Sequence, residues 1–500
     1  MKILFVTPEC GPFVKTGGLG DVAAALPRAL SALGHDVITL MPAYGGMEIG
    51  GSVQRVIAVP RVGRWPDAQL LQVEQASGER FLFLSCPFAF RNVRFPYGDS
   101  GAGAPPYAAV PFGLLAHVAA LLATDHSPLN WRADIVHAND WPCGLAPLYL
   151  KSERLAGRAK TARSVMTIHN LAFQGVFPMD AADLLDIPEP YRGMEGVEFW
   201  SQLSMLKAGL QQADVITTVS PTYAREIQDV ALGFGLDGVL RERSKHLHGL
   251  LNGIDTSVWN PRTDPLIAAQ YGPDDLALKA LNREALRKRA GLAPSEQLLL
   301  GLVGRLTQQK GVDLVIAGAP ALLAQGAHLV VLGKGDAVLE ESLLRLAAAH
   351  PHQVHLTLGF DEALAHQIEA GSDCFLMPSR FEPCGLNQMY SQAYGTPPVV
   401  TATGGLSDTV LDVTAAPGKG TGFVMRQANQ PAFDEAMQRV MRLWLDPIAW
   451  QSLQRRGMRQ DFGWEKAARQ YAALYESILL SDAPAPSLLA EPLTPDCPTV

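Results

Sequence analysis

The sequence predicts an α/β fold made of two parallel-sheet domains, and three observations support that prediction. The chain has 500 residues, of which 48% are apolar, enough for a large core and most naturally for two domains. Short β-branched runs alternate with helix-compatible stretches along both halves, the order expected of βαβ units. Glycine-rich or polar loops follow these runs, at the sheet edge where α/β proteins bind ligands.

Composition argues against several other classes of protein. The formal net charge of −8 disfavours binding to nucleic acids or to a membrane surface. The apolar run Ile3–Val6 is too short for a signal peptide, and the longest run, 108–123, is interrupted by proline, glycine and histidine, so it predicts a buried helix. The six cysteines have no paired spacing, which predicts neither disulfides nor a zinc site and suits a cytoplasmic location. The sequence leaves the oligomeric state open.

The first βαβ unit carries a glycine-rich turn. A strand at Ile3–Val6 leads to Lys15 and the run Gly17-Gly18-Leu19-Gly20-Asp21, followed by a helix over 22–33 and a strand over 37–41. The glycine spacing matches neither the dinucleotide fingerprint nor a P-loop. A lysine on a glycine loop suits a mobile cation that meets phosphate, although a plain surface lysine remains the alternative.

Two later strands end in polar residues. The strand 134–137 is followed by Asp140, and the strand 164–168 by His169 and Asn170. Because parallel strands end at the same sheet edge, these residues predict one site. A histidine alone would equally suit a core position bonded to the backbone, but Asp140 at an equivalent strand end favours the site.

The connections between these units are rich in glycine and proline. Residues 45–105 predict insertions and small hairpins, and a glycine cluster over 233–238 could line a cleft. It follows the strand 215–219 and a helix that ends near Ile227. The turn-rich stretch 252–265 predicts the hinge between the two domains.

A second α/β series begins with the buried strand 298–303. Arg305 and Lys310 come just after that strand, where two cations would match a pyrophosphate. A pair of solvated surface cations is the alternative. The strand 328–332 continues the series.

The stretch 379–410 is the part around which the chain is organised. A strand over 374–377 leads through Pro383 to a helix over 386–394, and a strand over 399–401 leads to the turn Gly404-Gly405 and a helix from about Ser407. Both loops feed helix N-termini, which favour phosphate. Glu382, between them, is a carboxylate that could bind sugar hydroxyls; the alternative is a solvated loop acid among glycines that only make turns.

Two smaller features complete the chain. Cys384 invites a nucleophilic interpretation, but beside a helix start a packed thiol is favoured. Residues 464–480 predict a terminal helix, and the Pro-, Ala- and Ser-rich tail 481–500 predicts disorder.

Together these motifs resemble the bacterial glycogen synthases and plant starch synthases, the ADP-glucose-using group of glycosyltransferase family five. The resemblance is carried, in the family's order, by Lys15–Val22, Thr167–Asn170, Asn252–Asp255, Gly304–Thr307 with Lys310-Gly311, and the Glu382 block. It implies two Rossmann-like domains that face each other across a deep cleft, the GT-B fold. The expected acceptor-side domain spans 1–250 and is completed by helix 464–480, and the expected nucleotide-sugar domain spans 251–463.

The resemblance also implies an activity and residue roles. The expected reaction moves glucose from ADP-glucose to the non-reducing end of an α-1,4-glucan, with retention of anomeric configuration and release of ADP. The preference for ADP-glucose over UDP-glucose rests on the resemblance alone. The implied catalytic residues are Asp140, His169, Arg305, Lys310 and Glu382. The implied substrate-binding residues are Lys15, Gly17, Gly18, Asp21, Asn170, Asn252, Asp255, Cys384, Gly385, Leu386, Thr403, Gly404 and Gly405.

The chain departs from the family pattern at two positions, and from many other retaining GT-B enzymes at a third. Asn139 and Pro142 stand where many members have histidines, which affects the acceptor-side contacts. Tyr390 stands where many retaining GT-B enzymes have a second acid, so Glu382 is alone in its block, as in the synthases of this group.

The residues also constrain the chemistry. The sequence has no D-x-D pair, so we expect neither a metal nor a cofactor, with Arg305, Lys310 and helix N-termini neutralising the departing diphosphate. No carboxylate stands out as the nucleophile of a double displacement, which favours same-face attack assisted by the leaving phosphate. The alternatives are a non-catalytic polysaccharide-binding protein, which would have lost the cations or Glu382, and other GT-B enzymes: an epimerase, a sucrose- or trehalose-type transferase, or a phosphorylase.

Overall fold

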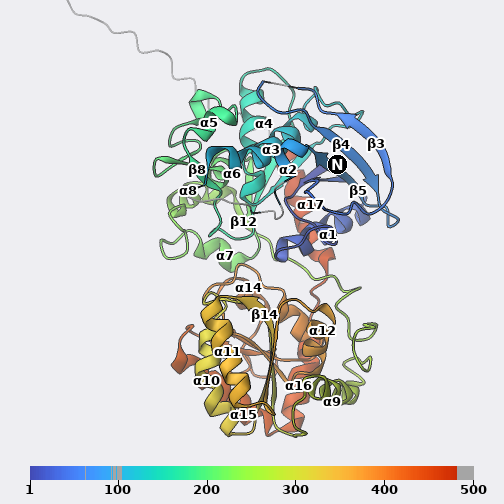
Figure 1. Cartoon of the computed structure of the whole chain (residues 1–500), viewed down its shortest axis with the longest axis vertical. Helices are drawn as coiled ribbons and strands as arrows, with labels where there is room; N and C mark the ends of the chain where they lie inside the picture. Colours follow the sequence, from blue (N-terminus) through green and yellow to red (C-terminus); the bar gives the residue numbers. More distant parts are fainter. Residues whose placement is uncertain (62, 92, 94–96, 98–103, 481–500) are drawn as a thin grey trace, which may run out of the picture.

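The chain folds into two α/β domains, one above the other (Figure 1). This computed structural model describes residues 1–61, 63–91, 93, 97 and 104–480. The expected disordered tail 481–500 lies outside the described residues, as does part of the 45–105 insertion. The fold class predicted from the sequence is confirmed.

The N-terminal sheet has the strand order β12-β11-β7-β6-β1-β2-β5-β4-β3. It is parallel from β12 to β5, and β4 and β3 extend it antiparallel at one edge. Its strands are β1 (Lys2–Val6), β2 (Asp36–Pro42), β3 (Val53–Ala58), β4 (Gln69–Glu74), β5 (Arg80–Ser85), β6 (Ile135–Asn139), β7 (Arg163–Ile168), β11 (Val215–Thr218) and β12 (Leu247–Gly249). The central strands are apolar on both faces because helices cover both sides. A small sheet of β8 (Val176–Pro178), β10 (Gln202–Ser204) and β9 (Glu198–Phe199) stands beside it.

The C-terminal sheet is parallel throughout, in the order β15-β14-β13-β16-β17-β18. Its strands are β13 (Leu299–Leu306), β14 (His328–Gly335), β15 (Val354–Leu358), β16 (Cys374–Met377), β17 (Pro398–Thr401) and β18 (Phe423–Met425). The chain reverses its direction of winding between β13 and β16, and ligands of open α/β sheets bind at such a switch point. The loops after β13, β16 and β17 carry Lys310, Glu382 and the Gly404-Gly405 turn.

Helices pack on both faces of both sheets (Figure 1). In the N-terminal domain they are α1 (Gly18–Ala32), α2 (Pro87–Phe90), α3 (Val110–Leu122), α4 (Leu145–Leu155), α5 (Ala181–Leu184), α6 (Met205–Gln212), α7 (Pro221–Glu226) and α8 (Asp237–Glu242). The C-terminal domain has α9 (Lys279–Arg289), α10 (Val312–Ala324), α11 (Ala337–Ala349), α12 (Glu362–Gly371), α13 (Asn387–Ala393), α14 (Gly404–Thr409), α15 (Gln430–Trp444) and α16 (Pro447–Met458). In the described part of the chain, no helix has the length and hydrophobicity that a membrane span requires.

The last helix, α17 (Trp464–Leu480), returns to the N-terminal domain and packs beside α1 (Figure 1). Its Tyr475 hydroxyl lies 2.7 Å from Nδ1 of the buried His137 on β6. The two segments that connect the domains run side by side, because the Ile254 N–H donates to the Phe462 carbonyl at 2.8 Å. The expected hinge therefore consists of two connecting segments that lie side by side.

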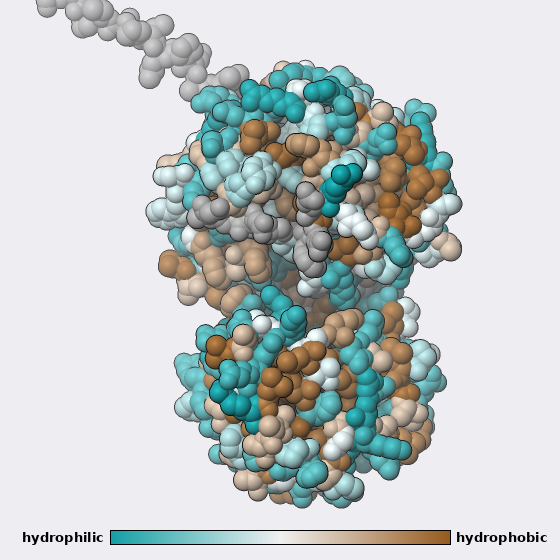
Figure 2. All heavy atoms as spheres, in the orientation of Figure 1, coloured by the Kyte–Doolittle hydropathy of each residue, from teal (hydrophilic) through white to brown (hydrophobic). Residues whose placement is uncertain are grey.

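The domains touch through α7 above and α14 below, and the surface narrows to a hollowed waist between them (Figure 2). The backbone N–H and hydroxyl of Thr222 both donate to the Asp408 carboxylate, at 2.8 and 2.7 Å. Ser220 donates to the Pro383 carbonyl at 2.7 Å. On the other side of the waist, Leu386 lies against Gly18, where an added Cβ would be 3.8 Å from its Cδ1.

Some element boundaries differ from the sequence predictions. Helix α1 begins at Gly18 rather than at residue 22, so two glycines lie inside its first turn. Strand β13 runs to Leu306, so Arg305 lies within the strand and the prediction that it follows the strand is wrong. Helix α14 begins at Gly404 rather than near Ser407. Each shift comes from glycines, whose poor intrinsic propensity is overridden by tertiary packing.

Candidate active site

Asp140 and its partners form the N-terminal half of the candidate site. Asp140 follows β6 in the left-handed region, with φ of +54°, and its side chain is buried. Its Oδ1 accepts from the His169 backbone N–H at 2.7 Å, and its Oδ2 accepts from the Tyr97 hydroxyl at 3.1 Å. Burial raises the pKa of Asp140 to about 7, despite these hydrogen bonds. The carboxyl therefore changes charge near neutral pH.

His169 is held as a neutral imidazole. Its Nε2 lies 2.9 Å from Oδ1 of Asn139. The amide nitrogen of Asn139 donates to the Val6 carbonyl at 2.9 Å, which fixes the amide so that its oxygen faces the ring. Nε2 must therefore carry the proton and Nδ1 the lone pair. Burial lowers the pKa of His169 to about 3, so the ring stays uncharged at neutral pH.

Asn139 and Pro142, the two departures from the family pattern, have separate structural consequences. Asn139 is fully buried and orients His169. Pro142 is buried in a single helical turn after Asp140 and offers no polar side-chain group. Asn170, which follows His169 in the loop after β7, uses its Oδ1 to accept from the Ala172 N–H at 3.1 Å.

The glycine loop is closed by Glu9, a residue that sequence reasoning did not single out. Its carboxylate accepts from the Thr16 hydroxyl at 2.7 Å and from the Gly17 N–H at 3.3 Å. Burial raises the pKa of Glu9, with these hydrogen bonds acting against the rise. An acid three residues after a buried strand was the available signal, but its partners could not be read from the sequence.

Lys15 and Asp21 pair with each other on this loop. The Lys15 ammonium lies 2.7 Å from Oδ1 of Asp21, and both side chains are partly exposed. Burial raises the pKa of Asp21, while Lys15 lowers it. Lys15 is therefore directed along the first turn of α1 rather than across to the other domain.

Glu382 and Lys310 form the C-terminal half of the site. The Lys310 ammonium bonds to Oε2 of Glu382, which also accepts from the Ser379 hydroxyl at 3.2 Å. Glu382 is buried, whereas Arg305 on strand β13 is exposed, and its side chain has no hydrogen bond or ion pair among the described residues. Thr307, in the same loop as Lys310, has a buried hydroxyl without a partner in the described part of the chain. The end of β13 and the loop after it thus offer an uncompensated cation, Arg305, and an unused hydroxyl, that of Thr307.

Gly404 and Gly405 bring the loop after β17 against the Glu382 loop. A Cβ on Gly404 would lie 1.9 Å from the Glu382 carbonyl oxygen, and Gly404 also has φ of +42°. A Cβ on Gly405 would lie 2.1 Å from the Cys384 carbonyl oxygen. Only glycine permits this close approach of two backbones. Gly385, at φ of +72°, makes the turn before α13.

The N–H of Gly404 is already occupied by a residue of the other domain. Glu226, at the end of α7, accepts from this N–H at 3.1 Å and from the Thr403 hydroxyl at 3.0 Å. Burial raises the pKa of Glu226, partly offset by these bonds. The expected glucose-binding turn therefore also joins the two domains, a contact that the sequence did not indicate.

Cys384 is a packed thiol rather than an activated one. It is buried, and burial raises its pKa to about 12. A thiol in this state is not a nucleophile at neutral pH. The nucleophilic interpretation of Cys384 is thus not supported by its surroundings.

Asn252 and Asp255 lie at the connection between the domains. Asp255 accepts from the Ser257 N–H at 2.9 Å and pairs with Arg28 of α1 at 3.3 Å. Asn252 is buried, and its Oδ1 has no partner within the described residues. Asp255 thus links α1 to the segment between the domains. Among the described residues, it bonds to neither Lys310 nor Glu382.

Among the described residues, neither a metal-binding cluster nor a separate cavity adds to the candidate site. In the described part of the chain, no group of three or more His, Cys, Asp or Glu side chains is arranged to hold a metal ion. An open cavity of about 490 Å³, lined by Lys2, Trp131 and Asp134 among others, lies where β1 and β6 begin. That is the opposite end of the strands from Asp140, and the cavity contains none of the predicted site residues.

Comparison with known proteins identifies the family. Residues 2–242 match the family described as the starch synthase catalytic domain, and residues 283–456 match the glycosyl transferases group 1 family. The chain is 59% identical over 481 residues to a glycogen synthase from Paracidovorax citrulli, covering 95% of this chain and 94% of the relative. The chain belongs to the glycogen and starch synthase family.

Other relatives agree with this family assignment. A glycogen synthase from Aromatoleum aromaticum is 50% identical over 480 residues, covering 95% of this chain and 96% of the relative. The catalytic domain of starch synthase IV from Arabidopsis thaliana, bound to ADP and acarbose, superposes with a TM-score of 0.86 at 30% identity, covering 95% of this chain and 99% of that one.

The comparisons also separate this family from other GT-B enzymes. A sucrose-phosphate synthase from Thermosynechococcus elongatus superposes with a TM-score of 0.58 at 18% identity, covering 95% of this chain and 98% of that one, and shares the fold alone. The family resemblance seen in the sequence motifs is confirmed. Membership of the glycogen and starch synthase family sets aside the alternatives of an epimerase, a phosphorylase and a sucrose- or trehalose-type transferase.

Proposed function

We propose that the waist between the two sheets carries out glucosyl transfer from ADP-glucose to the non-reducing end of an α-1,4-glucan, with retention of configuration and without a metal ion. Family membership establishes the glycogen synthase activity. The observation that best supports this location is the Lys310–Glu382 pair, at the switch point of the C-terminal sheet.

The diphosphate of the donor would be held by cations of the C-terminal domain. The exposed side chain of Arg305 has no partner in the described part of the chain, so it can meet a phosphate without first breaking another bond. Lys310 is bonded to Glu382, so an incoming diphosphate competes with that carboxylate for the ammonium. The unused Thr307 hydroxyl adds a donor. This set supplies the charge neutralisation that departure of ADP requires.

Glu382 would bind hydroxyls of the donor glucose once the diphosphate also bonds to the Lys310 ammonium. The close approach at Gly404 and Gly405 sets the Glu382 loop against the following loop. Asp140 and His169 would lie beside the same glucose from the other domain, with neutral His169 directing a lone pair on Nδ1. Asp140 and Glu382 are both oriented by hydrogen bonds. In the absence of a carboxylate that stands out as a nucleophile, we expect same-face attack assisted by the leaving phosphate rather than a covalent glucosyl-enzyme.

Closure of the domains would bring Lys15 to the donor. Lys15 belongs to the N-terminal domain and is paired with Asp21, whereas Arg305, Lys310 and Glu382 belong to the C-terminal domain. Movement about the paired connections at Ile254 and Phe462 would exclude water from the reacting glucose.

The buried cysteines support the expectation of a reducing, cytoplasmic location.

One experiment tests the substrate, the base preference and the metal together. The full chain is incubated with glycogen and either ADP-glucose or UDP-glucose, before and after exhaustive EDTA treatment, and the released nucleotide is measured. We expect higher catalytic efficiency with ADP-glucose and undiminished activity after EDTA. Equal or better use of UDP-glucose would contradict the base preference. Activity abolished by EDTA and restored by magnesium or manganese would contradict metal independence.

A further inference from the structure

A set of aromatic side chains outside the residues discussed above lies along the edge of the waist. We call Phe173, Trp200, Phe234 and Phe381 the aromatic rim. Trp200 is 79% exposed, Phe173 is 45% exposed and Phe234 is 39% exposed. The rings of Phe234 and Phe381 meet edge to face with centroids 5.8 Å apart. Trp200 lies against the backbone next to Phe234, since a Cβ on Gly235 would be 3.3 Å from the indole nitrogen.

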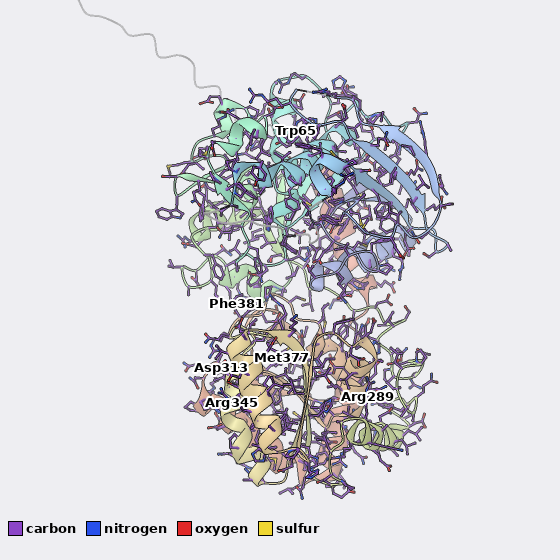
Figure 3. All side chains as sticks on the ribbon, in the orientation of Figure 1. Trp65, Arg289, Asp313, Arg345, Met377 and Phe381 are labelled. Atoms are coloured by element: carbon purple, nitrogen blue, oxygen red, sulfur yellow. The ribbon has the colours of Figure 1, made fainter. Side chains whose placement is uncertain are left out.

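The rim is continuous with both halves of the candidate active site. Phe381 immediately precedes Glu382 and lies at the edge of the C-terminal domain that faces the other domain (Figure 3). Phe173 contacts Tyr97, with ring centroids 6.1 Å apart, and the Tyr97 hydroxyl donates to Asp140. A molecule bound on the rim would therefore extend directly from the reacting sugar.

The backbone holds two of these rings outward at an energetic cost. Trp200 and Ser201, the turn between β9 and β10, have φ of +54° and +62°, and Phe234 has φ of +48°. Hairpin turns with such angles favour Asn-Gly, and a bulky residue there is strained. Among described residues other than glycine, the only other positive φ values are at Asp140 and Asp186. Strain of this kind persists mainly at functional sites.

Hydrogen bonds from side chains to backbone carbonyls tie the loops of the rim together. The Lys207 ammonium donates to the carbonyls of Met194 and, at 2.5 Å, Glu198, beneath the Trp200 turn. Gln174, next to Phe173, donates to the Phe234 carbonyl at 2.9 Å, and its own carbonyl accepts from the Ser204 hydroxyl at 3.0 Å. Three separate loops are thus fixed as one edge, which lowers the entropic cost of binding.

We propose that the aromatic rim binds the glucan acceptor beyond its reacting end, as an outer track that distinguishes long chains from short ones. This inference rests on the proposed function. Glucose units in α-1,4 linkage present apolar C–H faces and polar edges, and rigid exposed rings are the complementary surface for such faces. The position of Phe381 and Tyr97 beside the reacting groups favours the acceptor over a second copy of this chain as the occupant.

The test compares acceptors of two lengths. KM and kcat are measured for wild type, Trp200→Ala and Phe234→Ala with maltoheptaose and with maltose, using ADP-glucose and nucleotide release. We expect KM for maltoheptaose to rise about tenfold in each variant, the loss of one aromatic contact, with much less change for maltose. Trp200→Phe should restore most of the affinity for maltoheptaose. Phe88→Ala, an 83% exposed aromatic on α2 outside the rim, is the matched control and should behave as wild type.

Three outcomes would overturn the rim proposal. These are a maltoheptaose KM within twofold of wild type in both alanine variants, an equal rise in KM for both acceptors, and a loss of self-association in Trp200→Ala by sedimentation, which would assign the surface to a second copy. A failure of the proposed function is distinguishable, because wild type would then release no ADP with either acceptor.

Discussion

The two halves of the candidate site differ in how their charged groups are held. In the N-terminal half, Asp140 and His169 are enclosed and their bonds go to fixed groups of their own domain. In the C-terminal half, Arg305 is exposed, and Lys310 and Glu382 neutralise each other. One half is a preassembled hydrogen-bond network and the other is a set of charges that a ligand rearranges. The first half should therefore respond to protonation and the second to the donor.

This difference assigns separate parts of the reaction to the two domains. When a diphosphate draws on Lys310, Glu382 loses part of its counter-charge and becomes a stronger acceptor for sugar hydroxyls. On the proposed function, this rearrangement would place donor recognition and activation in the C-terminal domain. The N-terminal half would then supply groups that hydrogen bonds already hold in place, as electrostatic stabilisation of a transition state requires.

The largest effect is expected for Glu382→Ala. On the proposed role of Glu382, its loss would remove glucose contacts that tighten at the transition state, and it would leave Lys310 without its counter-charge. We expect kcat to fall on the order of a hundredfold or more, with a smaller change in KM for the donor. Steady-state kinetics with ADP-glucose and glycogen give both constants, and Glu382→Gln separates loss of charge from loss of shape. Near-normal turnover in Glu382→Ala would show that the site lies elsewhere.

The pH dependence tests the N-terminal half. The pKa of Asp140 is raised to about 7 and that of His169 is lowered to about 3, so a transition near neutral pH belongs to the aspartate. Because ionised Asp140 is the form that stabilises positive charge on the glucosyl group, kcat/KM should rise as pH increases through about 7. Below that pH it should fall by about tenfold per unit.

Two variants show whether Asp140 or His169 causes the transition in the pH profile. Asp140→Asn should have low activity and no transition near pH 7, whereas His169→Gln should retain the transition at reduced activity. A profile that keeps its transition in Asp140→Asn would remove Asp140 as its source.

Lys15→Ala tests whether the two halves meet by closure. We expect about tenfold lower kcat, the loss of one charge-assisted contact, while the Kd for ADP stays within about twofold of wild type because ADP is held by the other domain. Lys15→Arg should recover part of the activity. Small-angle scattering is the direct check: ADP together with an acceptor analogue should reduce the radius of gyration of the wild-type chain. An unchanged radius with a fully active Lys15→Ala variant would refute closure.

Most of the fold could be predicted from the sequence because each strand is a short apolar run between glycine, proline or polar residues. The run Cys374–Met377 coincides with β16, and Trp464–Leu480 coincides with α17. The loops after such strands also indicated where Asp140, His169 and Glu382 lie relative to the sheets. Periodicity and turn residues are local signals, and these features are local.

The contacts that join the two halves could not be predicted in the same way. Glu226 bonds to Gly404, 178 positions away, and Tyr97 bonds to Asp140 across 43 positions. Nothing local distinguishes Glu226 from any other acid at the end of a helix. The same holds for Asn139, whose role depends on Val6 fixing its amide.

The smallest effect is expected for Cys384→Ala, although this residue lies between Glu382 and Gly385 in the C-terminal half. If the C-terminal half acts through charges that a ligand rearranges, its thiol has no chemical part. The five described cysteines are all buried, and burial raises the pKa of Cys384 to about 12, so the thiolate is scarcely present at neutral pH. We therefore expect kcat within about twofold of wild type, since only a small packing loss remains. Mass spectrometry of the native enzyme during turnover should find no glucosylated cysteine. A hundredfold loss in Cys384→Ala, or a trapped thioglycoside, would mean that a covalent step takes place in this half.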